Sequence, residues 1–410
     1  MRKAFLCLFV LGLFGVSFVA PKEESVPNLI LILVDDMGYA DVGFNGCTDI
    51  PTPNIDKLAE SGVRFTNGYV SYCVCGPSRA GLLTGRYQER YGFGRNPLFT
   101  PNDPEMGLPL SEETLADALK QAGYKSVAIG KWHLGAHESL HPLKRGFDDF
   151  YGFLSGGHRY FPEELTLENE FEAKSQGDGY RTKLLRNHER VEETEYLTDA
   201  FSREAVSYIE QNLNLDENTI VVFLSDNGGP EKTNGSNNGI LRGQKSDLFE
   251  GGIRVPFAIK WPAKIPAGMV YDNPVISMDI FSTIIEQTGN PIQLKNTLDG
   301  TNLIPYLTGE NKSLPHDQLF WRKFDARDYA IRQGNEKLYI KGGSEKMLFN
   351  LSADISEENN IEGTNKERFQ QLYNEFTNWE QQLEDPVFMG LMQNKEYSDL
   401  HPDRFERKVK

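Results

Sequence analysis

Short continuous runs of apolar residues alternate with stretches of helical periodicity from residue 28 to about residue 290. The runs at 28–34 (NLILILV) and 219–224 (TIVVFL) each end in polar residues, which is typical of strands buried on both faces. Further strands are expected at 126–130 and 255–261, and helices at 54–61, 113–121 (capped by Ser111), 197–212 and 279–288. This alternation predicts an α/β fold with a large, mainly parallel sheet between layers of helices.

The pattern changes near residue 315. Four short runs rich in aromatic and β-branched residues predict a small antiparallel sheet at 319–324, 328–333, 337–341 and 346–350. The amphipathic segment 369–383 predicts one helix packed against that sheet. We therefore divide the chain into an N-terminal α/β domain at 25–312 and a C-terminal α+β subdomain at 313–410. The polar segment 159–195 is expected to be an inserted loop region near the functional site.

Polar residues follow both buried strands. Asp35 and Asp36 come directly after the first strand, and Asp226 and Asn227 come after the second. Ligands of open α/β sheets gather beyond the carboxyl ends of the strands, so these two clusters are expected to be neighbours in space. An Asp pair alone at a strand end is more often a turn or a helix cap, so the prediction depends on the second cluster.

The N-terminus has the pattern of an export signal. Arg2 and Lys3 precede the apolar run at 4–20 (AFLCLFVLGLFGVSFVA), and the polar residues PKEES follow. This predicts a signal peptide at 1–20 and a periplasmic or secreted protein with no membrane contact once the signal is removed. The alternative is an uncleaved membrane anchor, because the run is marginal in length for a membrane span.

Composition indicates a globular, anionic protein. The 410 residues are 39% hydrophobic, and 59 acidic against 43 basic residues give a formal net charge of -16. This argues against a nucleic-acid partner, although a basic cleft within an acidic surface stays compatible with a small anionic substrate. Cys7 lies in the signal, and the odd remainder of Cys47, Cys73 and Cys75 suggests one thiol with a separate task.

The segment 72–86 (YCVCGPSRAGLLTGR) holds the most specific motif. Its two parts, CGPSR at 75–79 and LTGR at 83–86, resemble the signature of type I sulfatases. The resemblance spans nearly the whole chain and implies the alkaline-phosphatase-like fold. In that family the cysteine is oxidised to formylglycine, so a formylglycine-generating enzyme is implied as a transient partner. A disulfide between Cys47 and Cys73 is then an open alternative for the other two thiols.

The resemblance assigns roles to Cys75 and Arg79. Formylglycine made from Cys75 is hydrated, and one hydroxyl attacks sulfur to form a covalent sulfate ester. The other hydroxyl then loses its proton, so that the aldehyde forms again and sulfate is eliminated. Arg79, one helical turn later, is expected to hold the hydrate and the neighbouring carboxylates in place.

The resemblance also implies a metal site. Asp35, Asp36, Asp226 and Asn227 match the family's ligands, together with an oxygen of the modified Cys75. Oxygen donors without histidine or thiolate favour Ca²⁺, with Mg²⁺ as the smaller competitor. The metal is expected to act as a Lewis acid on the sulfate group.

Two further blocks supply lysines for the sulfate group. Lys131 and His133 lie in GKWHLG at 130–135, where the resemblance implies that the lysine binds sulfate and the histidine deprotonates the second hydroxyl. Alternate residues of an extended segment point to the same side, so both are expected to face the site. Lys245, in LRGQKSDLFEGGIRVP at 241–256, is implied as the second sulfate-binding lysine.

His158 lies in the glycine-rich block SGGHRY at 155–160. It matches the family's histidine that contacts the leaving-group oxygen, which makes it a general acid together with Lys245. The alternative is a loop histidine that faces solvent.

A sulfated carbohydrate is the expected substrate, and both an algal galactan such as carrageenan and a host glycosaminoglycan stay open. RYGFGRNP at 90–97 resembles a stretch of carrageenan-active members. The expected sugar contacts are Arg95, Asn96, Arg159 and Trp321. One rival function is that of a phosphatase or phosphodiesterase on the same fold, with a Ser or Thr nucleophile and several His ligands. The other is a non-catalytic glycan-binding protein that has kept the fold.

Overall fold

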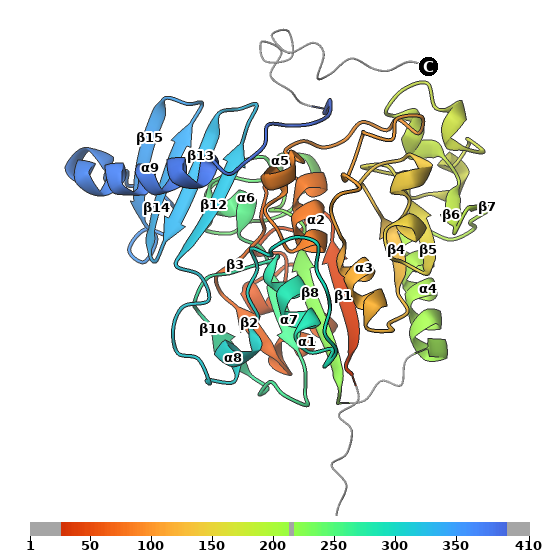
Figure 1. Ribbon diagram of the computed structural model, residues 1–410, viewed down its shortest axis with the longest axis horizontal. Helices are drawn as coiled ribbons and strands as arrows, with labels where there is room; N and C mark the ends of the chain where they lie inside the picture. Colours follow the sequence, from red (N-terminus) through yellow and green to blue (C-terminus); the bar gives the residue numbers. More distant parts are fainter. Residues whose placement is uncertain (1–25, 213–216, 392–410) are drawn as a thin grey trace, which may run out of the picture.

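The computed structural model describes residues 26–212 and 217–391, so the expected signal peptide at 1–20 lies outside the described residues. Its centre is a five-stranded sheet in the order β1-β8-β9-β2-β10 (Figure 1). These strands are β1 (Asn28–Val34), β8 (Thr219–Ser225), β9 (Phe257–Lys260), β2 (Val63–Phe65) and β10 (Met269–Tyr271). A separate parallel pair joins β3 (Gly68–Tyr69) to β11 (Val275–Ile276).

The central sheet is mixed, whereas the hydrophobic pattern predicted a mainly parallel one. β1 pairs with β8 and β2 with β10 in parallel, but β9 runs antiparallel to both β8 and β2. The chain between β8 and β9 holds only the two short helices α5 (Glu231–Asn234) and α6 (Glu250–Ile253). A parallel neighbour would need a crossover along the sheet, so β9 instead returns from the edge where β8 ends.

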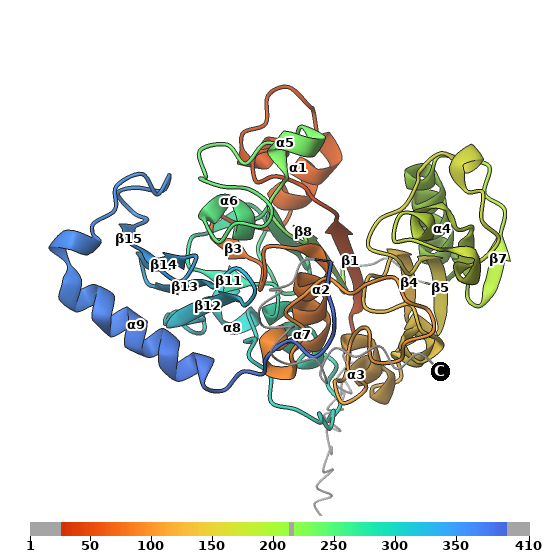
Figure 2. The same cartoon turned by 90° about the horizontal axis from the view of Figure 1, so that it is seen from above.

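Helices cover both faces of this sheet, as expected. Seen from above, α2 and α7 lie on one side of β1 and β8, and α1 lies on the other (Figure 2). The bounds are α1 (Pro53–Glu60), α2 (Cys75–Thr84), α3 (Leu115–Gln121), α7 (Asp279–Ile285) and α8 (Ile304–Leu307). The cap of α3 is Thr114 rather than Ser111, because Thr114 accepts from the backbone of Asp117 and the Asp117 side chain accepts in return.

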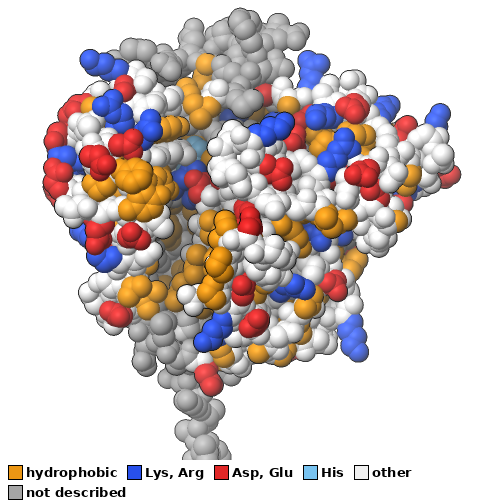
Figure 3. Space-filling view, turned by 180° about the vertical axis from the view of Figure 1, so that it is seen from behind, with side chains coloured by type: hydrophobic (Ala, Val, Ile, Leu, Met, Phe, Trp, Pro, Cys, Tyr) orange, Lys and Arg blue, Asp and Glu red, His pale blue; other side chains and the backbone are white. Residues whose placement is uncertain are grey.

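A second sheet forms the lobe at the right of Figure 1. It contains β4 (Val127–Lys131), β5 (Asp149–Phe153), β6 (Leu184–Arg186) and β7 (Glu189–Val191), with α4 (Leu197–Asn212) in the same lobe. β4 and β5 are parallel, and the other pairs are antiparallel. Seen from behind, the surface is furrowed between this lobe and the rest of the molecule (Figure 3).

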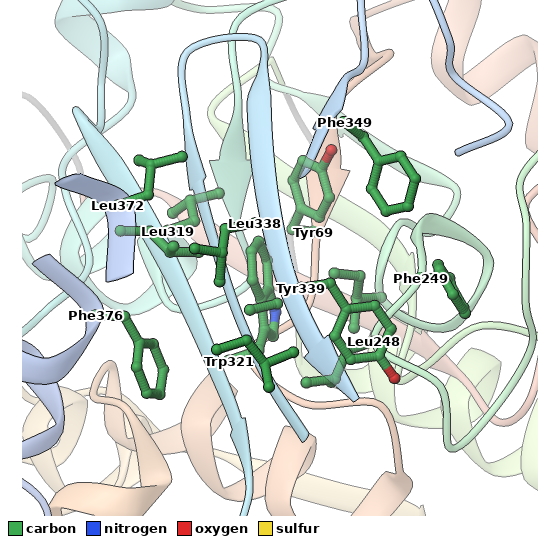
Figure 4. Packing of buried hydrophobic residues seen from close by; sticks show 14 of the residues in the cluster. Tyr69, Leu248, Phe249, Leu319, Trp321, Leu338, Tyr339, Phe349, Leu372 and Phe376 are labelled. Carbon is green, nitrogen blue, oxygen red and sulfur yellow. The ribbon is translucent and has the colours of Figure 1, made fainter. Parts of the chain in front are cut away.

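The C-terminal part forms the predicted antiparallel sheet and helix. The elements are β12 (Gln318–Lys323), β13 (Asp328–Gln333), β14 (Glu336–Lys341), β15 (Glu345–Asn350) and α9 (Lys366–Glu380). One buried cluster joins this sheet to the first domain: Trp321 and Tyr339 pack with Tyr69 and Phe249 (Figure 4). The boundary placed at residue 312 stays a prediction, and the two parts share this core.

Among the described residues no helix is both long and apolar enough to span a membrane. Cys47, Cys73 and Cys75 are all free thiols, so the structure does not contain the Cys47–Cys73 disulfide that was left open.

Candidate active site

The carboxyl ends of β1 and β8 lie side by side, because these strands pair in parallel with Val34 opposite Ser225. Asp36 donates its backbone N–H to Asp226 Oδ1 at 3.2 Å, and Asn227 Nδ2 donates to Asp36 Oδ1 at 2.8 Å. Asp36 has a φ of 60°, a left-handed conformation that turns the chain at the end of β1. The two polar clusters are therefore neighbours.

Cys75 is the first residue of α2 and is 3% exposed. Val74 before it is extended, so the chain enters the helix at the cysteine. Its Sγ and one carboxylate oxygen each of Asp35 and Asp226 lie within 4.8 Å of one another. The start of α2 thus brings the thiol to the strand ends.

Arg79 lies one turn further along α2. Its Nε donates to Asp226 Oδ2 at 2.8 Å, and its Nη1 donates to the carbonyl oxygen of Lys131 at 2.9 Å. Its Nη2 lies 3.5 Å from Asp35 Oδ1. Burial acts to lower the pKa of this guanidinium, but Asp226 and Asp35 outweigh burial and raise it, so Arg79 is charged. Because the guanidinium group is planar and charged, Arg79 holds the carboxylates of Asp226 and Asp35 in place.

The two predicted lysines reach the cluster from different parts of the chain. Lys131, the last residue of β4, places Nζ 2.7 Å from Asp35 Oδ1. Lys245, in the loop before α6, places Nζ 2.5 Å from Asp36 Oδ1 and 2.7 Å from Oδ2. Their ammonium groups and Arg79 thus oppose the negative charges of the three carboxylates.

The pKa values of Asp35 and Asp226 are shifted in opposite directions. Burial, followed by the nearby Asp35 carboxylate, raises the pKa of Asp226, although Arg79 and Lys131 act against this. Burial would also raise the pKa of Asp35, but Lys131 and Arg79 outweigh it and hold that pKa well below its usual range. Two acids held this close favour a cation between them.

His133 is buried beside Lys131, with a φ of 60°. It lies beyond the end of β4, so a turn rather than strand alternation brings it near Lys131. Burial lowers the pKa of its imidazole well below the usual value, and Lys131 and Arg79 lower it further. Neither ring nitrogen has a hydrogen-bond partner among the described residues. The imidazole is therefore neutral, and the lone pair of one ring nitrogen is not engaged.

The described contacts of His158 are with Phe153 and Arg159 rather than with the residues of this cluster. Its ring packs on Phe153 with centroids 4.5 Å apart, and its Nδ1 lies 2.9 Å from the carbonyl oxygen of Arg159. Burial lowers the pKa of His158 to about 4, so the ring is neutral near pH 7. Its Nε2 is buried without a hydrogen-bond partner among the described residues, and its role as an acid at the leaving group stays a prediction.

Two of the four expected sugar contacts are buried. Arg95 is 2% exposed and pairs with Asp325, and Trp321 is fully buried with its Nε1 donating to the Val70 carbonyl. Arg159 has an exposed side chain and stays a candidate. Asn96 is half-buried, and its Oδ1 lies 3.8 Å from the Sγ of Cys75.

Tyr160 was missed by the sequence argument. Burial raises the pKa of its hydroxyl, and the nearby Asp35 raises it further while Lys131 lowers it, which places the ring within electrostatic reach of the site. The signal that could have identified it is its position in the glycine-rich block at 155–160.

Comparisons with known proteins identify the family. A family model described as "Sulfatase" matches residues 27–214 and 155–290, and one described as "N-sulphoglucosamine sulphohydrolase, C-terminal" matches residues 244–385. N-acetylgalactosamine-6-sulfatase of Canis lupus familiaris is 33% identical over 365 residues, covering 74% of this chain and 69% of that protein. An arylsulfatase of Hemicentrotus pulcherrimus is 30% identical over 387 residues, covering 77% and 67%.

A solved structure agrees in fold over most of the chain. The crystal structure of Ps i-CgsB in complex with k-i-k-neocarrahexaose is 32% identical with a TM-score of 0.84, covering 92% of this chain and 98% of that one. With the matched family model and the relatives above, this shows that the chain belongs to the sulfatase family and is a sulfuric ester hydrolase.

Proposed function

We propose that this protein hydrolyses sulfate monoesters of a sulfated carbohydrate, with formylglycine made from Cys75 and with Ca²⁺ as its metal. One observation carries the proposal: the side chain of residue 75 meets Asp35 and Asp226 within 4.8 Å, at strand ends also reached by two lysines. A nucleophile beside acids that hold a cation, with ammonium groups for an anion, suits an anionic ester.

The donor set fits a hard divalent cation. Asp35, Asp36 and Asp226 supply carboxylate oxygens, and Asn227 Oδ1 is a buried amide oxygen with no hydrogen-bond partner among the described residues. Such an orphaned acceptor is costly unless it has a partner such as a cation. Ca²⁺ favours carboxylate and amide oxygens, and when bound it would polarise the sulfate group as a Lewis acid.

The chain's own residues then have separate tasks. Lys131 and Lys245 bind sulfate oxygens, and Arg79 orients the side chain of residue 75 and two of the carboxylates. His133, neutral and unpaired, accepts a proton from residue 75 during release of sulfate. Conversion of Cys75 to formylglycine by a maturing enzyme supplies the carbonyl that makes this residue the nucleophile for sulfur.

The carbohydrate part of the proposal is supported by two relatives. Ps i-CgsB was solved with a neocarrahexaose, and the similar mammalian enzymes are named for the 6-sulfate of N-acetylgalactosamine. A sulfated galactan and a glycosaminoglycan are therefore the saccharides to test first. The apolar run at 4–20 supports export to the periplasm or beyond, which N-terminal sequencing of the mature protein checks.

The deciding experiment uses protein expressed together with a formylglycine-generating enzyme. We expect the peptide containing residue 75 to lose about 18 Da, as replacement of CH2SH by CHO requires. We expect sulfate release from a sulfated oligosaccharide panel, and its loss in Cys75→Ala with an unchanged melting temperature. Phosphate release without sulfate release would instead indicate the phosphatase, and an unmodified thiol would indicate the glycan-binding protein.

A further inference from the structure

Asn96, in the segment that follows α2, lies against residue 75. Asn96 Oδ1 accepts the backbone N–H of Gly76 at 2.8 Å and lies 3.8 Å from the Sγ of Cys75. The first free N–H groups of a helix need such acceptors, because no earlier helical residue can supply them. The position of Asn96 therefore helps to fix the start of α2, where the nucleophile lies.

The residue before Asn96 is tied to the C-terminal subdomain. Arg95 Nε and Nη2 donate to the two oxygens of Asp325 at 2.8 and 2.7 Å, and Arg95 Nη1 donates to the carbonyl oxygen of Phe388. The Arg95 side chain is only 1% exposed. A bidentate, buried ion pair fixes both distance and direction, so Asp325 determines where this loop lies.

The same end of the β12–β13 hairpin also contacts the loop that carries Lys245. Lys323, the last residue of β12, donates from Nζ to the carbonyl oxygen of Ser246 at 2.6 Å. Ser246 has a φ of 77°, and its N–H donates to the carbonyl oxygen of Cys73 at 2.9 Å. Lys323 at the end of β12 and Asp325 in the following turn thus contact the loops that carry Lys245 and Asn96.

We propose that Asp325 and Lys323 are positioning residues for the reaction: together they hold Asn96 and Lys245 at their distances from residue 75. The proposal rests on the proposed function for its kinetic part, while its structural part stands independently. The hydrogen bonds of Asp325 and Lys323 described above go to Arg95 and to the Ser246 carbonyl oxygen, not to residue 75 itself. When the side chain of Asp325 or Lys323 is replaced, the loop that it holds can move. Small displacements of catalytic groups lower kcat more than they weaken substrate binding.

The test compares Asp325→Asn and Lys323→Met with a matched control, Asp299→Asn. Asp299 makes a bidentate pair with Arg90, and its side chain is 14% exposed against 16% for Asp325. Arg90 lies in the same stretch of chain, but its pair does not adjoin Asn96. We expect kcat to fall about 10- to 100-fold in Asp325→Asn and Lys323→Met with KM nearly unchanged. Asp299→Asn should keep kcat, and Asp325→Glu should recover part of it.

Amide hydrogen exchange gives a readout that needs no activity. We expect exchange at Gly76 to rise about tenfold or more in Asp325→Asn, and exchange at Ser246 to rise in Lys323→Met, with neither change in Asp299→Asn. Unchanged exchange at both amides, or equal loss of kcat in Asp299→Asn, would overturn the positioning role. Wild-type protein with converted residue 75 that releases no sulfate would overturn the proposed function, and the exchange pattern would still decide the positioning role.

Discussion

Asn227 shows how the polar atoms of one side chain divide between structure and chemistry. Its Nδ2 donates to Asp36 Oδ1 at 2.8 Å and to the carbonyl oxygen of Gly228 at 3.0 Å, which fixes the amide. Its Oδ1 is buried without a hydrogen-bond partner among the described residues. A buried acceptor left unpaired costs about 1–3 kcal/mol, so the orientation of this amide supports the proposed role of Asn227 as a metal ligand.

We expect Ca²⁺ to raise the melting temperature of the wild-type protein, because a ligand that binds only the folded state stabilises it. Asn227→Ala removes one oxygen ligand and should weaken Ca²⁺ binding by at least about tenfold. Substitution of residues that only hydrogen-bond to metal ligands already has an effect of this size. The measurement is the melting temperature against Ca²⁺ concentration. Asn238→Ala is the control, because this equally buried amide accepts from Gly229 N–H and should leave the Ca²⁺ dependence unchanged. The same dependence of melting temperature on Ca²⁺ concentration in Asn227→Ala and in wild type would contradict the ligand role.

Gly156 sets the position of the His133 ring. A Cβ at residue 156 would lie 2.4 Å from His133 Nε2, so Gly156→Ala must displace the imidazole. We expect kcat to fall about 10- to 100-fold through misplacement of the proton acceptor, with little change in melting temperature. Gly177→Ala is the control, since its Cβ would meet nothing closer than Ser175 Oγ at 3.9 Å. Full activity in Gly156→Ala would mean that His133 accepts no proton in the rate-limiting step.

At the scale of elements, the hydrophobic pattern predicted most strands and helices well because burial decides them. The strands 28–34 and 328–333 and the helix 197–212 are found with these bounds, and the other three C-terminal strands differ by one residue at one or both ends. What the pattern could not supply is the order of strands, since nothing local records that β9 lies between β8 and β2. The direction of loop side chains was also not predictable from the pattern, and the role of His158 stays a prediction.

The site residues at strand ends were predictable for a definite reason. Parallel neighbours end at the same edge, so Asp35 and Asp226 had to approach each other once β1 and β8 paired. The supporting contacts were not predictable, because Asp325 and Asn96 belong to turns whose partners are set by the docking of the C-terminal sheet.

β14 carries a buried lysine that joins the C-terminal sheet to α6. Lys337 Nζ lies 2.9 Å from Glu250 Oε1 and 2.9 Å from Glu357 Oε1, and all three side chains have no exposed surface or nearly none. Glu250 begins α6, which follows the loop of Lys245. A lysine between two buried acids compensates charge that would otherwise oppose folding.

Lys337→Met should therefore lower the free energy of unfolding by about 3–5 kcal/mol, the usual cost of leaving buried charge without its partner. Urea denaturation measures this value. Lys346→Met, on the exposed side of neighbouring β15, is the matched control and should change the free energy by less than about 0.5 kcal/mol. A loss below about 1 kcal/mol in Lys337→Met would mean that the acids take up protons and need no lysine.

At the scale of the whole molecule, the segment between the two parts is held by a half-buried histidine, His316. His316 Nε2 lies 2.7 Å from Asp279 Oδ1, and Asp279 begins α7 and also accepts the backbone N–H groups of Ile276 and Thr301. Burial would lower the pKa of His316, but Asp279 outweighs it and raises that pKa above its usual value of 6.5. The folded protein thus binds this proton more tightly than the unfolded chain.

The stabilisation from His316 is fully present below pH 6.5 and is lost as the pH rises through the higher pKa of the folded state. We expect the difference in free energy of unfolding between wild type and His316→Asn to be largest near pH 6 and to shrink towards alkaline pH. Denaturation series at several pH values measure it. A difference that is independent of pH would mean that the imidazole is neutral beside Asp279.

The parallel pairing of β1 with β8 also has a kinetic consequence. Asp36 and Asn227, 191 positions apart, share one hydrogen bond, so the oxygens proposed for the cation assemble only after a very long loop has closed. An ion that binds a site formed only late in folding does not increase the folding rate. Calcium would instead slow unfolding, and so prolong the lifetime of each native molecule.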